Sequence, residues 1–251
     1  MASSSERAGH VGAHLARYLR GGAGWYRDNG PRLAVVVGMV LVVLGVAGFL
    51  GVFDAVQEGD DLAAVDEPVL RGLAAARSDV LTFVLVAVST VTGPVVLPVV
   101  VVAAALLWGL VGRTWWQASL LAGAMVLSTV VSLAVKSGVG RERPPLDLMH
   151  VPGSETTYSF PSGHTIGTAT FLLVGGYLLW VRRPTVRRLV GGLVAVVGGT
   201  LVVAGSRLYL GYHFVTDVLA GVCLGLVTLG AVVAVSRWLD LRAIATHETD
   251  A

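Results

Sequence analysis

Polar side chains in this chain of 251 residues gather in three short clusters, each beside a long apolar stretch. Polar groups near membrane spans are costly, so those that persist are candidates for function. In chain order the clusters read Lys-x6-Arg-Pro at 136–144, Pro-Ser-Gly-His at 161–164 and Ser-Arg-x5-His-x3-Asp at 206–217. Together they supply cations, two histidines and one aspartate, which is a set that could bind and transfer an anionic group.

The cations of these clusters are Lys136, Arg143 and Arg207. Arginine forks and a lysine ammonium both bind phosphate oxygens, so their convergence predicts a site for a compact polyanion. Few acidic residues stand near them in the sequence, and no Asp, Asn or Glu cluster has the spacing of a Mg²⁺ site. We therefore expect no metal and no other cofactor, with the cations stabilising the charge of the reaction.

The histidines of these clusters suggest an activated nucleophile and a second proton-transfer group. His213 and Asp217 are four residues apart, one helical turn, so Asp217 can accept a hydrogen bond from one ring nitrogen and orient the other outward. His164 follows Ser162 and Gly163 where a new helix is expected to begin, and free backbone N–H groups there attract an anion. Gly163 lets a ligand approach the backbone closely, and His164 can protonate a leaving oxygen.

In this order and spacing, the three clusters resemble the signature of the type 2 phosphatidic acid phosphatase superfamily, which shares its core with vanadium-dependent haloperoxidases. The resemblance covers roughly residues 50–237 and implies a helical bundle core like that of acid phosphatases and haloperoxidases. All eleven fixed identities of the signature are present: Lys136, Arg143, Pro144, Pro161, Ser162, Gly163, His164, Ser206, Arg207, His213 and Asp217.

The resemblance also implies a role for each polar residue. His213 would attack phosphorus and carry a phosphohistidine, while Asp217 would hold the tautomer of its ring. His164 would act as general acid for the leaving group and then as base for water. The phosphoryl oxygens would be held by Lys136, Arg143, Arg207, the Ser162 hydroxyl and the Gly163 backbone N–H.

The composition indicates that the protein that carries these clusters is a membrane protein. The chain is 55% hydrophobic and 14% charged, against about 25% charged in ordinary soluble domains, and its mean hydropathy is +0.76. So much apolar surface cannot be buried inside one globule of this size. Low charge excludes a disordered chain, and the single cysteine, Cys223, excludes a disulfide-stapled secreted domain. The dispersed arginines also argue against nucleic-acid binding.

The apolar segments predict an all-α polytopic protein with six transmembrane helices. The first, at 33–53, has 21 uncharged residues, about 31 Å as a helix. The uncharged run 80–111 is too long for one perpendicular span, and Gly93-Pro94 interrupts it, so we expect a short helix at 80–92 packed against the membrane. The six expected spans are 33–53, 94–112, 115–136, 163–181, 188–206 and 213–236, and a short surface helix is expected at 66–77.

Arginine asymmetry predicts the orientation. With both termini in the cytoplasm, the inner segments hold 12 of the 18 basic residues, as the positive-inside rule requires. The expected organisation is a cytoplasmic tail at 1–31, a six-span phosphatase domain at 32–237 and a cytoplasmic tail at 238–251. The three clusters then lie at the extracytoplasmic face of the plasma membrane.

Several of these residues also have a purely structural interpretation. Lys136 and Arg143 alone could be interfacial anchors, and Ser162 could be a helix N-cap. Arg141 and Glu142, inside the first cluster, are interpreted as a local ion pair. Three further residues of the outer loop could shape substrate access but are interpreted as solvated; they are Asp147, His150 and Glu155.

These observations predict a metal-independent phosphatase that acts on a lipid phosphate or a polyprenyl diphosphate such as undecaprenyl diphosphate. Its expected partners are that lipid and the bilayer. Two other classes stay open: a non-catalytic or transport-type anion-binding membrane protein, and a haloperoxidase with vanadate at the phosphate position. A transporter needs polar groups midway along its spans, where this sequence has few, and a bilayer-embedded site suits a haloperoxidase poorly.

Overall fold

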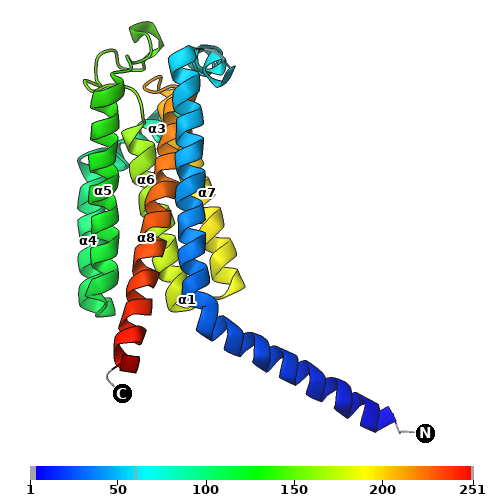
Figure 1. The fold of residues 1–251 in the computed structure, drawn as a ribbon. Coiled ribbons are helices and arrows are strands. Elements are labelled where there is room, and N and C mark those ends of the chain that lie inside the picture. Colours follow the sequence, from blue (N-terminus) through cyan, green and yellow to red (C-terminus); the bar gives the residue numbers. More distant parts are fainter. Residues whose placement is uncertain (1–3, 60, 250–251) are drawn as a thin grey trace. The chain divides into compact units, whose positions relative to one another are not determined.

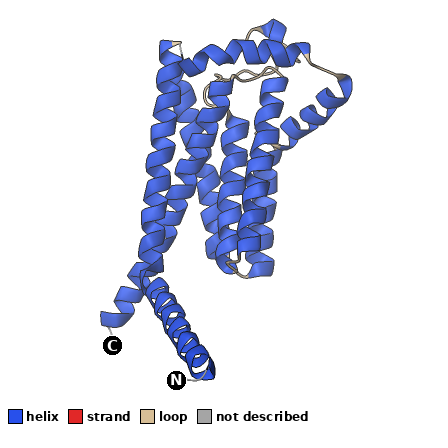
Figure 2. Cartoon of the chain, turned by 90° about the vertical axis from the view of Figure 1, so that its right-hand side faces the viewer, coloured by secondary structure: helices blue, strands red, loops and turns tan. Residues whose placement is uncertain are grey.

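The computed structural model describes the backbone of residues 4–59 and 61–249, and the side chains of residues 30–59, 62–239 and 241. Throughout the described backbone the chain forms helices and connecting loops without a strand (Figures 1 and 2). Residues 40–232 form one compact unit, which holds every candidate site residue, and residues 1–39 with 233–251 form a second. The elements are α1 (Ser4–Glu58), η1 (Asp61–Val65), α2 (Asp66–Ala75), α3 (Asp79–Val91), α4 (Val96–Gly112), α5 (Trp115–Val139), η2 (Leu146–Leu148), α6 (Gly163–Arg182), α7 (Val186–Tyr209) and α8 (Val215–Thr249).

Five of these helices are long and apolar enough to cross a bilayer. Large apolar side chains stand on their outer surfaces, such as Val43 at 64% and Val194 at 67% exposed. Water would make such exposure costly, whereas lipid chains cover it without cost, and a helix satisfies its own backbone there. The expectation of an all-α, multi-span membrane protein is confirmed. The spans are Gly30–Glu58, Trp115–Val139, Gly163–Arg182, Val186–Tyr209 and Val215–Leu239.

The sixth expected span is a bent pair of helices. α4 has 17 residues, about 26 Å, which is short of the roughly 30 Å bilayer core. α4 is long enough to cross a bilayer only together with α3, and the two helices are bent by 55° relative to each other. The expected full span at 94–112 is therefore too short by itself, because Gly93 and Pro94 belong to the break and α4 begins only at Val96. The six-span count holds if α3 and α4 make one broken crossing.

The connections of the 40–232 unit divide between the two ends of its helices. η1, α2 and the loop 140–162 lie at one end, and the α4–α5 and α6–α7 connections lie at the other (Figures 1 and 2). The surface helix expected at 66–77 is α2. The three polar clusters all belong to the first of these ends.

Glycines on α8 let α6 approach it closely, which brings the second and third clusters together. A Cβ at Gly221 would lie 3.1 Å from the Ser162 carbonyl oxygen, and one at Gly225 would lie 2.8 Å from the Ala169 Cβ. The small-residue spacing of these glycines therefore serves packing, as in other membrane helix pairs. The backbone N–H of Ser162 also donates to the Asp217 carbonyl at 3.0 Å.

Candidate active site

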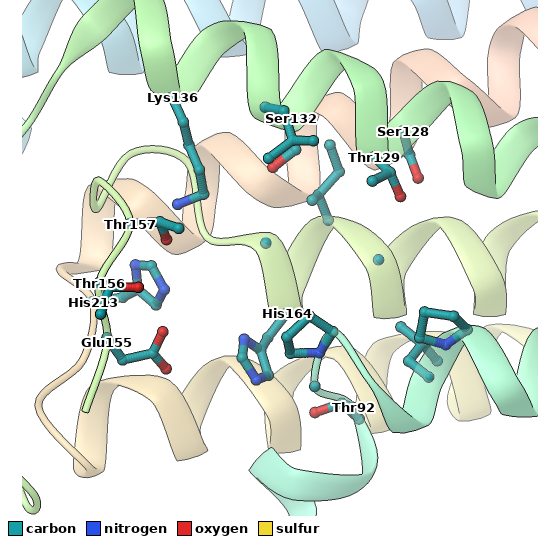
Figure 3. A pocket seen from close by; sticks show the side chains of 18 of the residues that line it. Thr92, Ser128, Thr129, Ser132, Lys136, Glu155, Thr156, Thr157, His164 and His213 are labelled. Carbon is teal, nitrogen blue, oxygen red and sulfur yellow. The ribbon is translucent and has the colours of Figure 1, made fainter.

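A cavity of about 400 Å³ lies where the three clusters meet (Figure 3). The last turn of α5, the loop 140–162, the first turn of α6 and the loop between α7 and α8 all contribute to its wall. Three further predicted residues, Ser162, Arg207 and Asp217, are almost completely buried, at 0%, 1% and 0% exposed. The predicted residues that line the cavity are Lys136, Arg143, Gly163, His164 and His213.

His213 and Asp217 form a pair at the start of α8. The helix begins only at Val215, so the pair does not share a helical turn as the spacing suggested. Instead, Asp217 folds back over the helix N-terminus, as in a capping box: its Oδ2 accepts from the Phe214 N–H at 2.9 Å and lies 3.3 Å from His213 Nδ1. The other ring nitrogen, Nε2, lies 3.5 Å from Arg143 Nη1. Asp217 therefore orients the ring so that Nε2 is directed toward a cation.

Arg143 ties the loop 140–162 to the loop that carries His213. Its Nη1 donates to the Tyr212 carbonyl at 2.7 Å and its Nε donates to the Thr157 carbonyl at 2.6 Å. A guanidinium held at two of its nitrogens has a fixed plane, which favours binding of a tetrahedral anion in one orientation. The cation beside Nε2 is thus positioned before any ligand arrives.

Arg207 is held by α3. Its Nη1 donates to Ser89 Oγ at 2.5 Å, and its guanidinium lies over the Tyr212 ring at 4.6 Å. Its Nε is buried and has no hydrogen-bond partner among the described residues. The His164 ring lies just beyond the end of the same helix, because a Cβ at Gly93 would lie 3.4 Å from its Nε2. The helix at 79–91, whose role the sequence left open, thus helps to position one cation and one histidine.

Lys136 binds the loop that leads into α6. Its ammonium donates to the backbone carbonyls of Tyr158 and Ser159, the latter at 3.3 Å. An ammonium has three donors, so one remains for a ligand. A Cβ at Gly163 would lie 4.0 Å from the Lys136 Cε, which places this lysine directly over the N-terminus of α6.

The second cluster is split between the cavity and the protein interior. His164 and Gly163 line the cavity, and Figure 3 shows the His164 ring pointing into it. Ser162 occupies the N-cap position of α6 but makes no side-chain cap to a backbone N–H. Its hydroxyl oxygen accepts from Thr165 Oγ1 at 3.0 Å, which leaves its own O–H as a donor, and Ser162 is completely buried beside the cavity wall.

Glu155 is the site residue that the sequence interpretation missed. It was interpreted as a solvated loop residue, yet its carboxylate pairs with Arg207 and, at 3.2 Å, with Arg143 Nη2, and its side chain is 23% exposed. In Figure 3 it points into the space beside His213 and His164. The cations therefore do have an acidic partner. Glu155 and Arg207 are 52 positions apart in the sequence, so no local sequence pattern indicates that they form a pair.

Arg141 does not pair with Glu142, as its sequence neighbourhood suggested. Its guanidinium donates to Asp217 Oδ1 at 2.7 Å and to Asp66 Oδ2 at 2.8 Å, while Glu142 is exposed. Asp66 is the first residue of α2, and it is buried at 3% exposed. Both residues thus belong to the surroundings of the His213–Asp217 pair.

Burial and the surrounding cations set the charge state of the two titratable groups in the loops of the site. Complete burial and the positive charges of Arg207, Arg143 and Lys136 lower the pKa of His213 well below its ordinary value, so its imidazole is neutral at neutral pH. Burial works against ionisation of Glu155, but Arg207 and Arg143 outweigh it and lower the pKa of this carboxyl. Its negative charge is therefore present throughout the physiological range.

Within the described side chains, no group of three or more His, Cys, Asp or Glu residues could hold a metal ion. Lys136 and Arg143 line the cavity, and Arg207 is linked to Arg143 through Glu155. The fold and the site together define an integral membrane protein with a buried His–Asp pair beside a cationic cavity.

Comparison with known proteins identifies the family. The model of the PAP2 superfamily matches residues 117–240, which include all three clusters. Phosphatidylglycerophosphatase B of Bacillus subtilis (strain 168) is 34% identical over 121 residues, 45% of this chain and 55% of that protein. Phosphatidylglycerophosphatase B of Escherichia coli (strain K12) is 40% identical over 88 residues, 35% of this chain and 31% of that protein. The chain belongs to the type 2 phosphatidic acid phosphatase (PAP2) superfamily.

A solved structure agrees with this assignment. The crystal structure of a transmembrane PAP2 type phosphatidylglycerolphosphate phosphatase from Bacillus subtilis matches with a TM-score of 0.65 at 26% identity, over 75% of this chain and 94% of that chain. In sequence, the chain spans about half the length of the Bacillus subtilis relative, at 55%, and about a third of the Escherichia coli one, at 31%.

Proposed function

We propose that this protein is a metal-independent membrane phosphatase that hydrolyses the phosphate ester of a lipid through a phosphohistidine on His213. One observation carries the proposal. The His213 ring has Nδ1 on the Asp217 carboxylate and Nε2 at 3.5 Å from Arg143 Nη1, at the wall of a cavity. A carboxylate on one nitrogen leaves the lone pair on the other, beside a cation suited to hold the phosphoryl group.

The first step forms the phosphorus–nitrogen bond. His213 Nε2 attacks phosphorus with its lone pair, and Nδ1 keeps its proton toward Asp217. The electrons of the ester P–O bond go to the lipid oxygen, which takes a proton from His164 and leaves as an alcohol. Arg143 and Arg207 stabilise the charge on the phosphoryl oxygens as it redistributes.

The second step returns the enzyme to its starting state. A water molecule attacks phosphorus and gives a proton to His164, which regains the proton it lost. The electrons of the phosphorus–nitrogen bond return to His213 Nε2, and inorganic phosphate leaves. Neither step requires a metal, because the cations of the site neutralise the transferred group.

The shape of the cavity supports a lipid substrate. Below the charged residues its wall continues along α4, α5 and α6 with apolar side chains, interrupted on α5 by the hydroxyl residues Ser128, Thr129 and Ser132. On α5 the lining extends from Lys136 to Met125, about 16 Å along the helix axis, which is enough to hold the first part of an acyl chain. The other apolar side chains of the lining are Pro94, Leu97, Pro98, Leu133 and Ile166. Phosphatidylglycerophosphate is the first candidate by the names of the relatives, and phosphatidic acid and undecaprenyl diphosphate are the alternatives.

The proposed activity is tested by phosphate release from the detergent-purified protein with EDTA present. Phosphatidylglycerophosphate, phosphatidic acid and undecaprenyl diphosphate are compared in parallel, each beside the His213→Ala protein. We expect release from at least one lipid, unchanged by EDTA and absent in His213→Ala. Strict dependence on Mg²⁺, or equal release by His213→Ala, would overturn the proposal. Release from none of the lipids while phosphate still binds would favour the anion-binding, non-catalytic alternative.

Arginines support an extracytoplasmic site in the plasma membrane. At the end opposite the cavity, the α4–α5 and α6–α7 connections contain Arg113 and Arg183 and no acidic residue, and the first turn of α7 adds Arg187 and Arg188. Short loops rich in arginine stay in the cytoplasm, which supports a cavity on the outer side. In a Cys223→Ala background, Asp147→Cys should react with a membrane-impermeant maleimide on intact cells, and Arg187→Cys should react only after lysis. The reverse labelling pattern would place the site in the cytoplasm.

A further inference from the structure

A closed hydrogen-bond network joins the His213–Asp217 pair to α2 and to the loop 140–162. Asp217 Oδ1 accepts from Arg141 Nη1 at 2.7 Å. The other oxygen, Oδ2, accepts from Phe214 N–H at 2.9 Å and from Ser159 Oγ. Donors on both oxygens fix the plane of the Asp217 carboxylate. They thereby fix the direction from which this carboxylate contacts His213 Nδ1.

Arg141 is itself held by a second buried carboxylate. Its Nη2 donates to Asp66 Oδ2 at 2.8 Å, and its Nη1 also donates to Thr216 Oγ1 at 2.7 Å. Asp66 in turn accepts from the Thr216 backbone N–H at 3.0 Å and from the Thr216 hydroxyl at 2.6 Å. The guanidinium lies 4.3 Å above the Phe214 ring. One guanidinium thus lies between two carboxylates, each anchored to the first turn of α8.

The charge of this group matters for the reaction. Two carboxylates and one guanidinium carry a net charge of −1, placed next to the ring that becomes positive when Nε2 attacks phosphorus. Without Arg141, Asp66 and Asp217 would be two buried like charges, at 3% and 0% exposed, with no cation between them. Without the charge of Asp66, the full charge of Arg141 would act on Asp217 alone.

We infer that Arg141 and Asp66 are positioning residues for the nucleophile: they hold Asp217 in the orientation, and at the net charge, that His213 requires. The inference rests on the proposed phosphohistidine function. Neither residue lies among the fixed positions of the signature. A merely structural link between α2 and α8 would stabilise the fold but would not act on catalysis through Asp217.

The test is a double-mutant cycle on kcat, with thermal unfolding measured for every variant. Arg141→Ala is expected to lower kcat by about 10- to 100-fold with KM changed by less than about 3-fold, and Arg141→Lys should recover part of the loss. In an Asp217→Asn background, Arg141→Ala should cost less than about 3-fold, because residues that act as a unit are not additive. Asp66→Asn should behave like Arg141→Ala with a smaller loss.

Matched controls lie on the surface of α2. Arg71 and Glu67 also form an ion pair, but their side chains are 68% and 55% exposed, so Arg71→Ala and Glu67→Gln should leave kcat unchanged. The inference is overturned if Arg141→Ala lowers kcat by the same factor in both backgrounds, or if it acts on KM alone. If Arg141→Ala does not fold, Arg141→Lys and Asp66→Asn provide the same comparison. Activity that is independent of His213 would instead refute the proposed function.

Discussion

Replacement of His213 by alanine is expected to lower kcat by about 10⁴-fold or more, as loss of a nucleophile does in other covalent catalysts. The cations on the cavity wall are Lys136 and Arg143, whose proposed role is to bind the phosphoryl oxygens, so neither replaces the lost nucleophile. Burial and the surrounding cations lower the pKa of His213, so its ring stays neutral as the pH falls from 8 to 6. Protonation of His213 should therefore cause no loss of kcat/KM in that range.

His164→Ala separates the two chemical steps. Loss of the general acid is expected to cost about 10²- to 10⁴-fold with a lipid phosphate. The loss should be much smaller in the first step with p-nitrophenyl phosphate, whose leaving group needs no proton. The second step still lacks its base, so a phosphoenzyme should accumulate that is labile in acid and stable in alkali.

The control for both variants is His150→Ala, because His150 lies in the loop 140–162, at the same end of the helices, and is exposed. It should retain full activity. Substantial turnover by His213→Ala, or a phosphoenzyme in which the label lies on another residue, would contradict the proposed mechanism.

Apolar run length was sufficient to predict most of the fold, because a helix in lipid must satisfy its own backbone and cross a fixed thickness. It failed at 94–112, where the Gly93-Pro94 break removes the first residues from α4 and leaves 17. Whether such a fragment joins α3 depends on packing between helices, which hydropathy does not record.

The positions of the histidines and cations could be predicted because they stand at the ends of apolar runs. Their local geometry was harder to predict. The four-residue spacing of His213 and Asp217 suggested one helical turn, but His213 lies in the loop before α8 and Asp217 caps the N-terminus of that helix. Glu155, Arg141 and Asp66 could not be assigned because their partners are far away in sequence, 75 positions apart for Asp66 and Arg141. Their role is indicated only by the structure, through their ion pairs and their partial or complete burial.

Glu155→Gln is expected to tighten the binding of inorganic phosphate by about 10- to 100-fold, the effect of removing one charge from a partly buried ion-pair cluster. The Glu155 carboxylate lies on Arg143 and Arg207, the two arginines that we propose bind the phosphoryl group. A bound phosphate must displace this carboxylate or share the arginines with it. Glutamine keeps the size and one oxygen acceptor but removes the competing charge.

The measurement is the inhibition constant of phosphate for the wild-type and Glu155→Gln proteins, with Glu142→Gln as the control from the exposed part of the same loop. Because Arg207 and Arg143 lower the pKa of Glu155 in spite of its burial, the wild-type carboxylate stays ionised as the pH falls from 8 toward 5. The ratio of the two constants should therefore be constant over that range, since the titration of phosphate itself is common to both proteins. A weaker phosphate affinity in Glu155→Gln would mean that the carboxylate organises the arginines for the ligand and does not compete with it. Product phosphate should also leave Glu155→Gln more slowly, so its kcat should fall where release limits turnover, while Glu142→Gln keeps the wild-type value.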